Sequence, residues 1–221
     1  MKIGFKATLI ACLFASYAAA EGISMGTHVG AGFVKFWDGD ELNDFLGVGI
    51  TGSLDMKLPI SSAFSFHPAV ALTLRSESKE YHDTSSYSRT ATLEFYQFNL
   101  EFPFLLQANL TNRIFLEMGP FIALNMKSGA SWIIKMGGQD YSFDATVNQK
   151  SVEAGLIFGG GFSITKKIDL GARFSLGLTP LFKKVEDDAE EDIEEENTEE
   201  DNSLIKAKSF TVYVGATFWF I

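Results

Sequence analysis

Every second position in the C-terminal stretch 210–221 carries an apolar side chain, and this alternation constrains the fold more than any other feature of the chain. The apolar positions are Phe210, Val212, Val214, Ala216, Phe218 and Phe220. Successive side chains of a β-strand point to opposite faces, so the stretch predicts a strand with one apolar face. Such a strand is typical of a transmembrane β-barrel. It would also suit the last strand of a soluble β-sandwich, and the remaining sequence has to distinguish the two.

The same two-residue period recurs along the chain, whereas no segment after residue 20 shows sustained helical periodicity. It predicts eight strands, at 22–36, 45–57, 64–76, 92–106, 113–126, 151–164, 168–181 and 209–221. The connections alternate between short turns and the longer, more polar segments 38–44, 77–91, 127–150 and 182–208. Short turns at one rim and long loops at the other are the pattern of outer-membrane barrels. We therefore predict an all-β fold for residues 21–221, an eight-stranded antiparallel up-and-down transmembrane β-barrel.

The glycines favour the barrel over the sandwich. Most strand glycines share a face with the polar residues, namely Gly26, Gly30, Gly32, Gly47, Gly49, Gly119, Gly155, Gly159, Gly161, Gly171, Gly177 and Gly215. The polar face of a soluble sandwich is wet and would carry Lys and Glu instead. An eight-stranded barrel has an interior only wide enough for its own side chains, so inward glycines leave space for larger neighbours. Pro68, Pro103 and Pro120 interrupt predicted strands, and we expect a β-bulge at each.

Residues 1–20 have the features of a cleaved signal peptide. A short basic region is followed by an apolar core and by Ala18-Ala19-Ala20, a small-residue cleavage site. Leu9-Ile10-Ala11-Cys12 offers an alternative, lipidation of Cys12, although few residues precede it. Cleavage after Ala20 would leave a chain without cysteine, which excludes thiol catalysis and cysteine metal sites.

The acidic character of the chain belongs to one segment. The net charge is −10, and the run from Glu186 to Asp201 accounts for the excess of acids, so the rest is close to neutral. No basic patch suggests nucleic acid as a partner. The run predicts a solvated extracellular loop within about 182–208, extended by self-repulsion. Weak, unselective capture of divalent cations there is the alternative, because the spaced pattern of a calcium loop is lacking.

Charged residues at inward positions predict an ion-pair network in the barrel interior. Its members are Asp55, Arg75, Glu101, Glu117, Glu153, Asp169 and Arg173, and His28 and His67 share their face. A charge inside a narrow barrel must be paired, because removing it from water costs several kcal/mol. We expect a structural plug in which Arg173 is shared between Glu117 and Glu153. A small gated pore or proton path is the alternative. No residue pattern predicts a cofactor or a metal site.

Aromatic residues mark the long segment 127–150, which predicts a hairpin around Gly137-Gly138 that extends beyond the membrane. Trp132, Tyr141 and Phe143 suit an interfacial girdle or a contact patch for a partner. Trp37 and Trp219 are further girdle candidates.

Four motifs resemble the PorT-like family of outer-membrane β-barrels. They are Asn99-Leu100-Glu101-Phe102-Pro103-Phe104-Leu105-Leu106, Leu116-Glu117-Met118-Gly119-Pro120, the glycine-rich stretch 155–161, and Asp169-Leu170-Gly171-Ala172-Arg173-Phe174-Ser175-Leu176-Gly177-Leu178. Gln107 stands where the family usually has lysine, and the acidic run is not a family feature. The resemblance covers about 95–181 and implies an OmpA-type barrel in the outer membrane rather than a particular activity.

These observations predict an outer-membrane protein with a structural or interaction role and no enzymatic activity. Its expected partners are outer-membrane lipid and a surface or periplasmic protein. A small pore or transport protein is the first alternative. A lipid-modifying enzyme is the second, since some eight-stranded barrels use a histidine with a serine, but His28, His67 and His82 stand at no recognisable nucleophile spacing.

Overall fold

The computed structural model describes residues 22–37, 45–83, 89–136, 139–145, 149–182 and 206–220. The predicted signal peptide, Cys12 and the acidic run Glu186–Asp201 lie outside these residues, so all three stay predictions. In the described part of the chain, no helix is long and apolar enough to cross a membrane.

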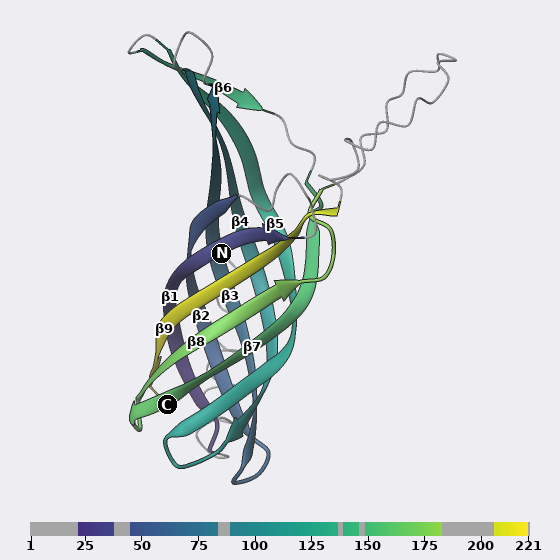
Figure 1. Cartoon of the computed structure of the whole chain (residues 1–221). Helices are drawn as coiled ribbons and strands as arrows, with labels where there is room; N and C mark the ends of the chain where they lie inside the picture. The colour runs from purple at the N-terminus through teal and green to yellow at the C-terminus, as the bar shows by residue number, and fades with distance from the viewer. Residues whose placement is uncertain are drawn as a thin grey trace, which may run out of the picture.

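Nine strands make up almost all of the described structure (Figure 1). Their bounds are β1 Ser24–Trp37, β2 Leu46–Pro59, β3 Phe64–Asp83, β4 Arg89–Asn109, β5 Ile114–Met136, β6 Gln139–Ala145, β7 Val152–Thr165, β8 Ile168–Gly177 and β9 Lys208–Trp219. Eight of them form a closed antiparallel ring in the order β4-β3-β2-β1-β9-β8-β7-β5, because β4 also pairs with β5. A closed ring satisfies the backbone hydrogen bonds internally, as a bilayer requires. The eight-stranded barrel predicted from the alternation is confirmed.

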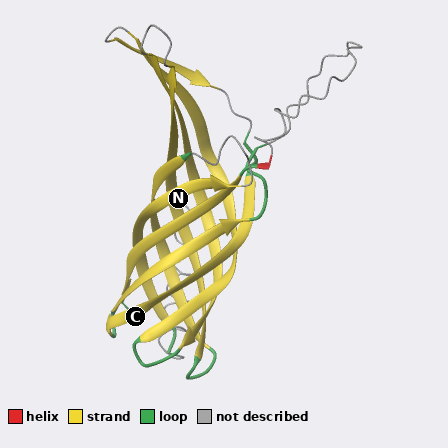
Figure 2. Ribbon diagram, in the orientation of Figure 1, coloured by secondary structure: helices red, strands yellow, loops and turns green. Residues whose placement is uncertain are grey.

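The two rims of the barrel differ. Residues 60–63, 110–113 and 166–167 form tight turns at one rim, where β9 also ends (Figure 2). The strand extensions lie at the other rim, where the longer segments of the sequence join the strand ends. Because outer-membrane barrels have short periplasmic turns and longer extracellular loops, the first is the periplasmic rim and the second the extracellular rim.

The structure corrects the predicted lengths of β3 and β4 and confirms the predicted extension of β5. β3 continues to Asp83 and β4 starts at Arg89, so much of the predicted loop 77–91 is strand. β5 continues to Met136 and pairs there with β6, so the hairpin predicted around Gly137-Gly138 is confirmed, with β6 as a separate strand outside the ring. These segments rise as a sheet above the extracellular rim (Figure 1). The sequence prediction ended the strands where lipid-facing apolar residues end, but strands continue in water when they pair with each other.

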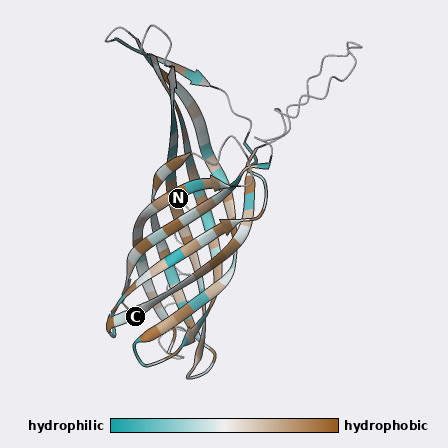
Figure 3. Cartoon of the chain, in the orientation of Figure 1, coloured by the Kyte–Doolittle hydropathy of each residue, from teal (hydrophilic) through white to brown (hydrophobic). Residues whose placement is uncertain are grey.

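Hydrophilic and hydrophobic residues alternate along the ring strands (Figure 3). Exposed apolar residues form the outer surface, including Val29, Phe33, Val48, Ile50, Leu72, Leu116, Met118, Phe158, Phe162 and Val214. The opposite face of each strand lines the lumen and holds the buried polar residues. This inside-out arrangement needs a bilayer around it, as predicted from the glycines.

Gly32 allows β1 and β9 to approach closely inside the lumen. A Cβ at Gly32 would overlap the carbonyl oxygen of Val212, whereas a Cβ at the lipid-facing Gly52 would lie 3.9 Å from the carbonyl oxygen of His28. We expect Gly32→Ala to lower the free energy of unfolding by about 1–3 kcal/mol, because the two strands must separate. Gly52→Ala, the matched control, should change it by less than about 0.5 kcal/mol. Urea titration in detergent, scored by the fraction that migrates as folded on unheated gels, measures both, and equal losses would contradict the close-approach argument.

The bulges predicted at the three prolines are wrong. Strand pairing is interrupted beside Pro68, Pro103 and Pro120, but the register is the same on both sides of each gap. A proline removes one backbone donor, and here this costs local pairing without inserting a residue. The register shifts lie elsewhere, between Phe98 and Asn99 on β4 and between Ser163 and Thr165 on β7.

Candidate functional site

The seven charged residues proposed for the interior all project into the lumen, from β2, β3, β4, β5, β7 and β8. The structure does not join them into one network. It divides them between an upper cluster near the extracellular rim, a lower cluster nearer the periplasmic rim, and Asp169 at the periplasmic mouth.

Arg75 is the centre of the upper cluster, which we define as Arg75, Glu77, Glu101 and Glu153. Its guanidinium Nη2 donates to Glu101 Oε1 at 2.6 Å, and Nη1 donates to Glu153 Oε2 at 3.2 Å. Ser209 on β9 donates to the other carboxylate oxygen of Glu153. The cluster therefore connects β3, β4, β7 and β9 across the lumen.

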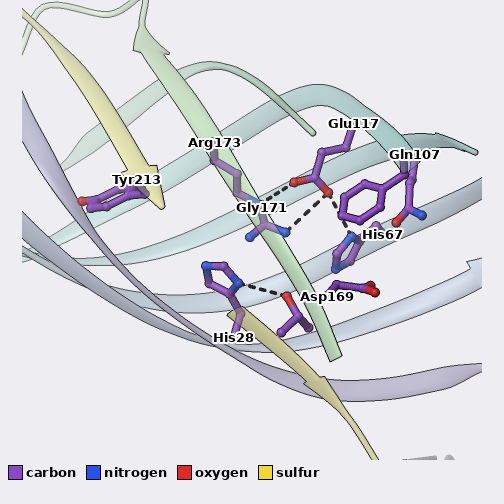
Figure 4. A pocket seen from close by; sticks show the side chains of 10 residues that line it. His28, His67, Gln107, Glu117, Asp169, Gly171, Arg173 and Tyr213 are labelled. Atoms are coloured by element: carbon purple, nitrogen blue, oxygen red, sulfur yellow. Dashed lines mark hydrogen bonds and ion pairs between the residues drawn. The ribbon is translucent and has the colours of Figure 1, made fainter. Parts of the chain in front are cut away.

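His67 is the centre of the lower cluster, which we define as Asp55, His67, Glu117 and Arg173. Figure 4 shows His67, Glu117 and Arg173. The Nε2 of His67 lies 3.1 Å from Asp55 Oδ2, and its Nδ1 lies 3.2 Å from Glu117 Oε2. Arg173 Nε donates to Glu117 Oε1 at 2.6 Å, and Arg173 Nη2 lies 3.7 Å from Asp55 Oδ2. Two carboxylates thus face one guanidinium and one imidazole.

The expected sharing of Arg173 between Glu117 and Glu153 is wrong in its second half. Glu153 pairs with Arg75, and the second acid beside Arg173 is Asp55. The tilt of the strands causes this difference, because it decides which residues of distant strands reach the same height in the lumen. The sequence reveals which residues point into the lumen, but it does not reveal their height along the barrel axis.

Asp169 closes the periplasmic mouth together with Trp219, a predicted girdle residue, and Lys57, which the sequence analysis did not single out. Its Oδ2 accepts a hydrogen bond from the indole nitrogen of Trp219 at 2.7 Å and lies 3.3 Å from Lys57 Nζ. Lys57 Nζ in turn lies 4.3 Å from the centre of the Trp219 ring. Trp219 is therefore buried in the lumen, and its proposed place in a lipid-facing girdle is wrong. Trp219 lies on the same face of β9 as the inward Tyr213 and Thr217. This two-residue period indicates an inward side chain, whereas the girdle prediction relied on the residue type.

Two members of the clusters lay outside the predicted network. His67 on β3 lies on the lumen face, as Asp55 does on β2, and a tight turn joins the two strands. The two-residue period was therefore the sequence feature that could identify His67 as an inward residue. Glu77 fell in a predicted loop, although it continues the inward face of β3 from Arg75. It is 1% exposed, and neither carboxylate oxygen has a hydrogen-bond partner within the described residues.

Four phenylalanines fill the lumen above the upper cluster, and we call Phe36, Phe45, Phe95 and Phe182 the aromatic plug. The centre of the Phe36 ring lies 5.9 Å from those of Phe45 and Phe95 and 6.0 Å from that of Phe182. Leu181 and Ala207 pack against the same cluster. Phe45 and Phe182 lie outside β2 and β8. The predicted strand 45–57 begins at Phe45, where the two-residue period indicates the lumen face of Asp55, whereas Phe182 follows the predicted strand 168–181 and the period does not place it.

The inward residues of β4 follow these layers from the extracellular to the periplasmic rim. Phe95 belongs to the aromatic plug, Glu101 to the upper cluster, and Leu105 to an apolar layer with Phe121, Ala123 and Ile157. A cavity of about 20 Å³ lies below, and its lining includes His28, His67, Gln107, Glu117, Arg173 and Tyr213. It has room for about one water molecule and for no larger ligand. No group of described residues is arranged to hold a metal ion.

A four-stranded sheet stands above the extracellular rim, and we call it the protruding sheet. It comprises 78–83 of β3, 89–94 of β4, 131–136 of β5, and β6. Its start is set by Ser78, the last residue of β3 that pairs with β2, opposite Leu46. The partner of β5 changes there as well, from β7 below the rim to β6 above it.

One face of the protruding sheet is aromatic. Leu93 lies opposite Trp132, and Trp132 lies opposite Phe143, so the three share a face that continues the lumen side of the barrel. Its large apolar side chains include Tyr81, Leu93, Trp132, Ile134, Tyr141 and Phe143, and we call these six residues the aromatic face. Phe143 is 56% exposed and Tyr141 43%. The reverse face is polar, with Glu80, Glu94, Asp140 and Asp144.

The girdle interpretation of Trp132, Tyr141 and Phe143 is therefore wrong. A girdle residue projects from the lipid-facing side of a strand, whereas these three project from the lumen side, above the rim. The register shift at Phe98/Asn99 contributes to this, because it exchanges the two faces of β5 above the barrel.

A closed ring with a lipid-facing apolar surface and a filled polar lumen defines an outer-membrane β-barrel protein. The chain belongs to the family described as outer membrane protein beta-barrel domain, whose model matches residues 15–183. The protein is accordingly placed in the outer membrane, among its lipids.

Similar solved structures have low sequence identity. Neisserial surface protein A is 15% identical with a TM-score of 0.48, and the match covers 90% of this chain and 100% of that chain. Ail, the attachment invasion locus protein of Yersinia pestis, is 10% identical with a TM-score of 0.38, over 89% and 98% of the two chains. The Escherichia coli outer membrane protease OmpT is 8% identical with a TM-score of 0.36, over 90% and 95%. No curated protein matches the sequence.

Proposed function

We propose that the protein is a non-conducting barrel that presents the protruding sheet at the cell surface for contact with another macromolecule. The observation that carries this proposal is the exposed aromatic face. Apolar side chains above the membrane gain nothing from lipid, and an exposed apolar patch of this kind commonly marks an interaction site.

The filling of the lumen supports an anchoring role rather than transport. The aromatic plug, the upper cluster, the apolar layer, the lower cluster and the Lys57–Trp219 contact follow one another along the described lumen. Each arginine there is bound by carboxylates on other strands, so the ion pairs act as cross-links between strands. We infer that the two clusters have this structural role.

The arrangement of the histidines does not favour the lipid-modifying alternative. Ser53 in the lumen donates to Asp55 rather than to a histidine, and His28 Nδ1 lies 3.0 Å from Thr217 Oγ1 inside the lumen. A hydrolase of membrane lipid needs its nucleophile where an acyl chain can reach it. We therefore propose no enzymatic activity. Loss of acyl hydrolysis on replacing His28, His67 or His82 would contradict this.

Within the barrel family, we propose that the chain is a PorT-like member, on the motifs in 95–181. We also propose a surface partner at the protruding sheet in preference to a periplasmic one, because the short periplasmic turns present no comparable apolar face.

Planar-bilayer recording tests the proposal, and we expect no steady single-channel current from the purified, refolded protein. Arg173→Ala should also stay silent, because the aromatic plug and the upper cluster remain in place. It should nevertheless lower the free energy of unfolding by about 2 kcal/mol. That is less than the loss of about 3–5 kcal/mol for breaking a buried ion pair, since His67 remains between Asp55 and Glu117. A reproducible steady current from the wild type would favour the pore alternative and overturn the proposed function.

A further inference from the structure

The outer edge of β6 is unpaired within the described residues, because β6 is the terminal strand of the sheet and pairs with β5 alone. An unpaired edge offers a row of backbone donors and acceptors to another strand. Proteins use such edges to bind extended peptides, with specificity set by alternate side chains. β6 stands above the extracellular rim, where a partner can reach it (Figure 1).

The side chains of β6 alternate between acidic and aromatic. Asp140 and Asp144 project from the polar face, and Tyr141 and Phe143 belong to the aromatic face. All four are exposed. On the neighbouring β5, a basic residue faces only one of the two aspartates. Asp140 lies opposite Lys135, whereas Asp144 lies opposite Ser131.

This alternation disfavours a second copy of the chain as the added strand. An antiparallel pair of β6 strands centred on Ser142 would use the whole strand, but it would place Asp140 opposite Asp144 of the copy, twice. Like charges directly opposite each other destabilise a strand pair, whereas opposite charges stabilise it. A partner strand with basic residues opposite Asp140 and Asp144 would instead be stabilised at both positions.

We propose that β6 binds an extended polypeptide segment in which basic and apolar residues alternate, as an additional strand of the protruding sheet. Basic side chains lie opposite Asp140 and Asp144, and apolar side chains extend the aromatic face beside Tyr141 and Phe143. The inference deepens the proposed function and rests on it, since it names the chemistry of the partner.

The test uses a labelled synthetic peptide about as long as β6, blocked at both ends, with the sequence Ala-Lys-Val-Thr-Val-Lys-Ala. Fluorescence polarisation reports its binding to the full chain in detergent. We expect saturable binding, weakened at least about tenfold when both lysines of the peptide are replaced by glutamate. The variant Asp140→Lys/Asp144→Lys should reverse this preference and bind the glutamate peptide better.

A peptide with N-methyl groups at alternate residues separates strand addition from charge attraction, because it keeps its lysines but cannot form the edge hydrogen bonds. We expect its binding to be lost. The inference is overturned if this peptide binds equally well, if the aspartate variant keeps its preference for lysine, or if no saturable binding occurs. A dimer held through β6 would also overturn it, in favour of a second copy. Conductance is measured separately, so failure of peptide binding leaves the proposed function intact.

Discussion

Replacing Arg75 with methionine is expected to lower the free energy of unfolding by about 3–5 kcal/mol, the range for removing one partner of a buried ion pair. Arg75 is 1% exposed and is bound by both Glu101 and Glu153. Without it, the carboxylates of the upper cluster would face each other in the lumen with no cation among them. Methionine is similar in length to arginine, so the decrease in the free energy of unfolding reflects the lost charge more than the lost side-chain volume.

Urea unfolding in lipid vesicles, followed by tryptophan fluorescence, measures this loss. The triple variant Arg75→Met/Glu101→Gln/Glu153→Gln should recover most of the stability, because neutral amides need no counter-ion. Lys135→Met is the control, because it removes a positive charge from an exposed position. It should change the free energy of unfolding by less than about 0.5 kcal/mol. If Arg75→Met and Lys135→Met have the same small effect, the upper cluster does not cross-link the strands.

Phe95→Ala is expected to cost about 3–5 kcal/mol, as for other buried phenylalanines. The Phe95 ring contacts Phe36, Phe45 and Phe182, with ring centres 5.4–5.9 Å apart. Alanine would leave a cavity in the middle of the aromatic plug that neighbours on separate strands and loops cannot easily fill.

Phe143→Ala is the matched control, because Phe143 is 56% exposed on the same sheet. It should stay within about 0.5 kcal/mol of the wild type in the same urea titration. A loss at Phe95 no larger than at Phe143 would show that the aromatic plug is not a packed core. The two variants also separate roles, since only Phe143 should affect binding of the lysine peptide to β6.

The pleat of the strands explains why the two surfaces of the barrel could be predicted. Along β8, Asp169 and Arg173 alternate with Leu170 and Ala172, and lipid tolerates only the second pair. Because a bilayer surrounds the ring and the lumen is narrow, parity alone assigns each residue to one surface. The inward direction of all seven predicted charged residues followed from this rule.

The limits of parity explain the errors. Trp219 was assigned to the girdle by residue type against its own parity, and the structure places it beside Asp169. Trp132 and Phe143 lie above a register shift, where parity counted from the barrel no longer holds. A local pattern cannot reveal a shift that depends on the neighbouring strand.

The strand period, the even number of ring strands, the lipid-facing surface and the set of inward charges could all be predicted from the amino-acid sequence, since each depends on contacts with a surrounding medium. Three contacts could be found only in the folded chain: Arg75 binds Glu153, Arg173 lies beside Asp55, and phenylalanines from separate segments close the lumen. These contacts depend on strand tilt and ring closure, which set the relative height of residues far apart in the chain.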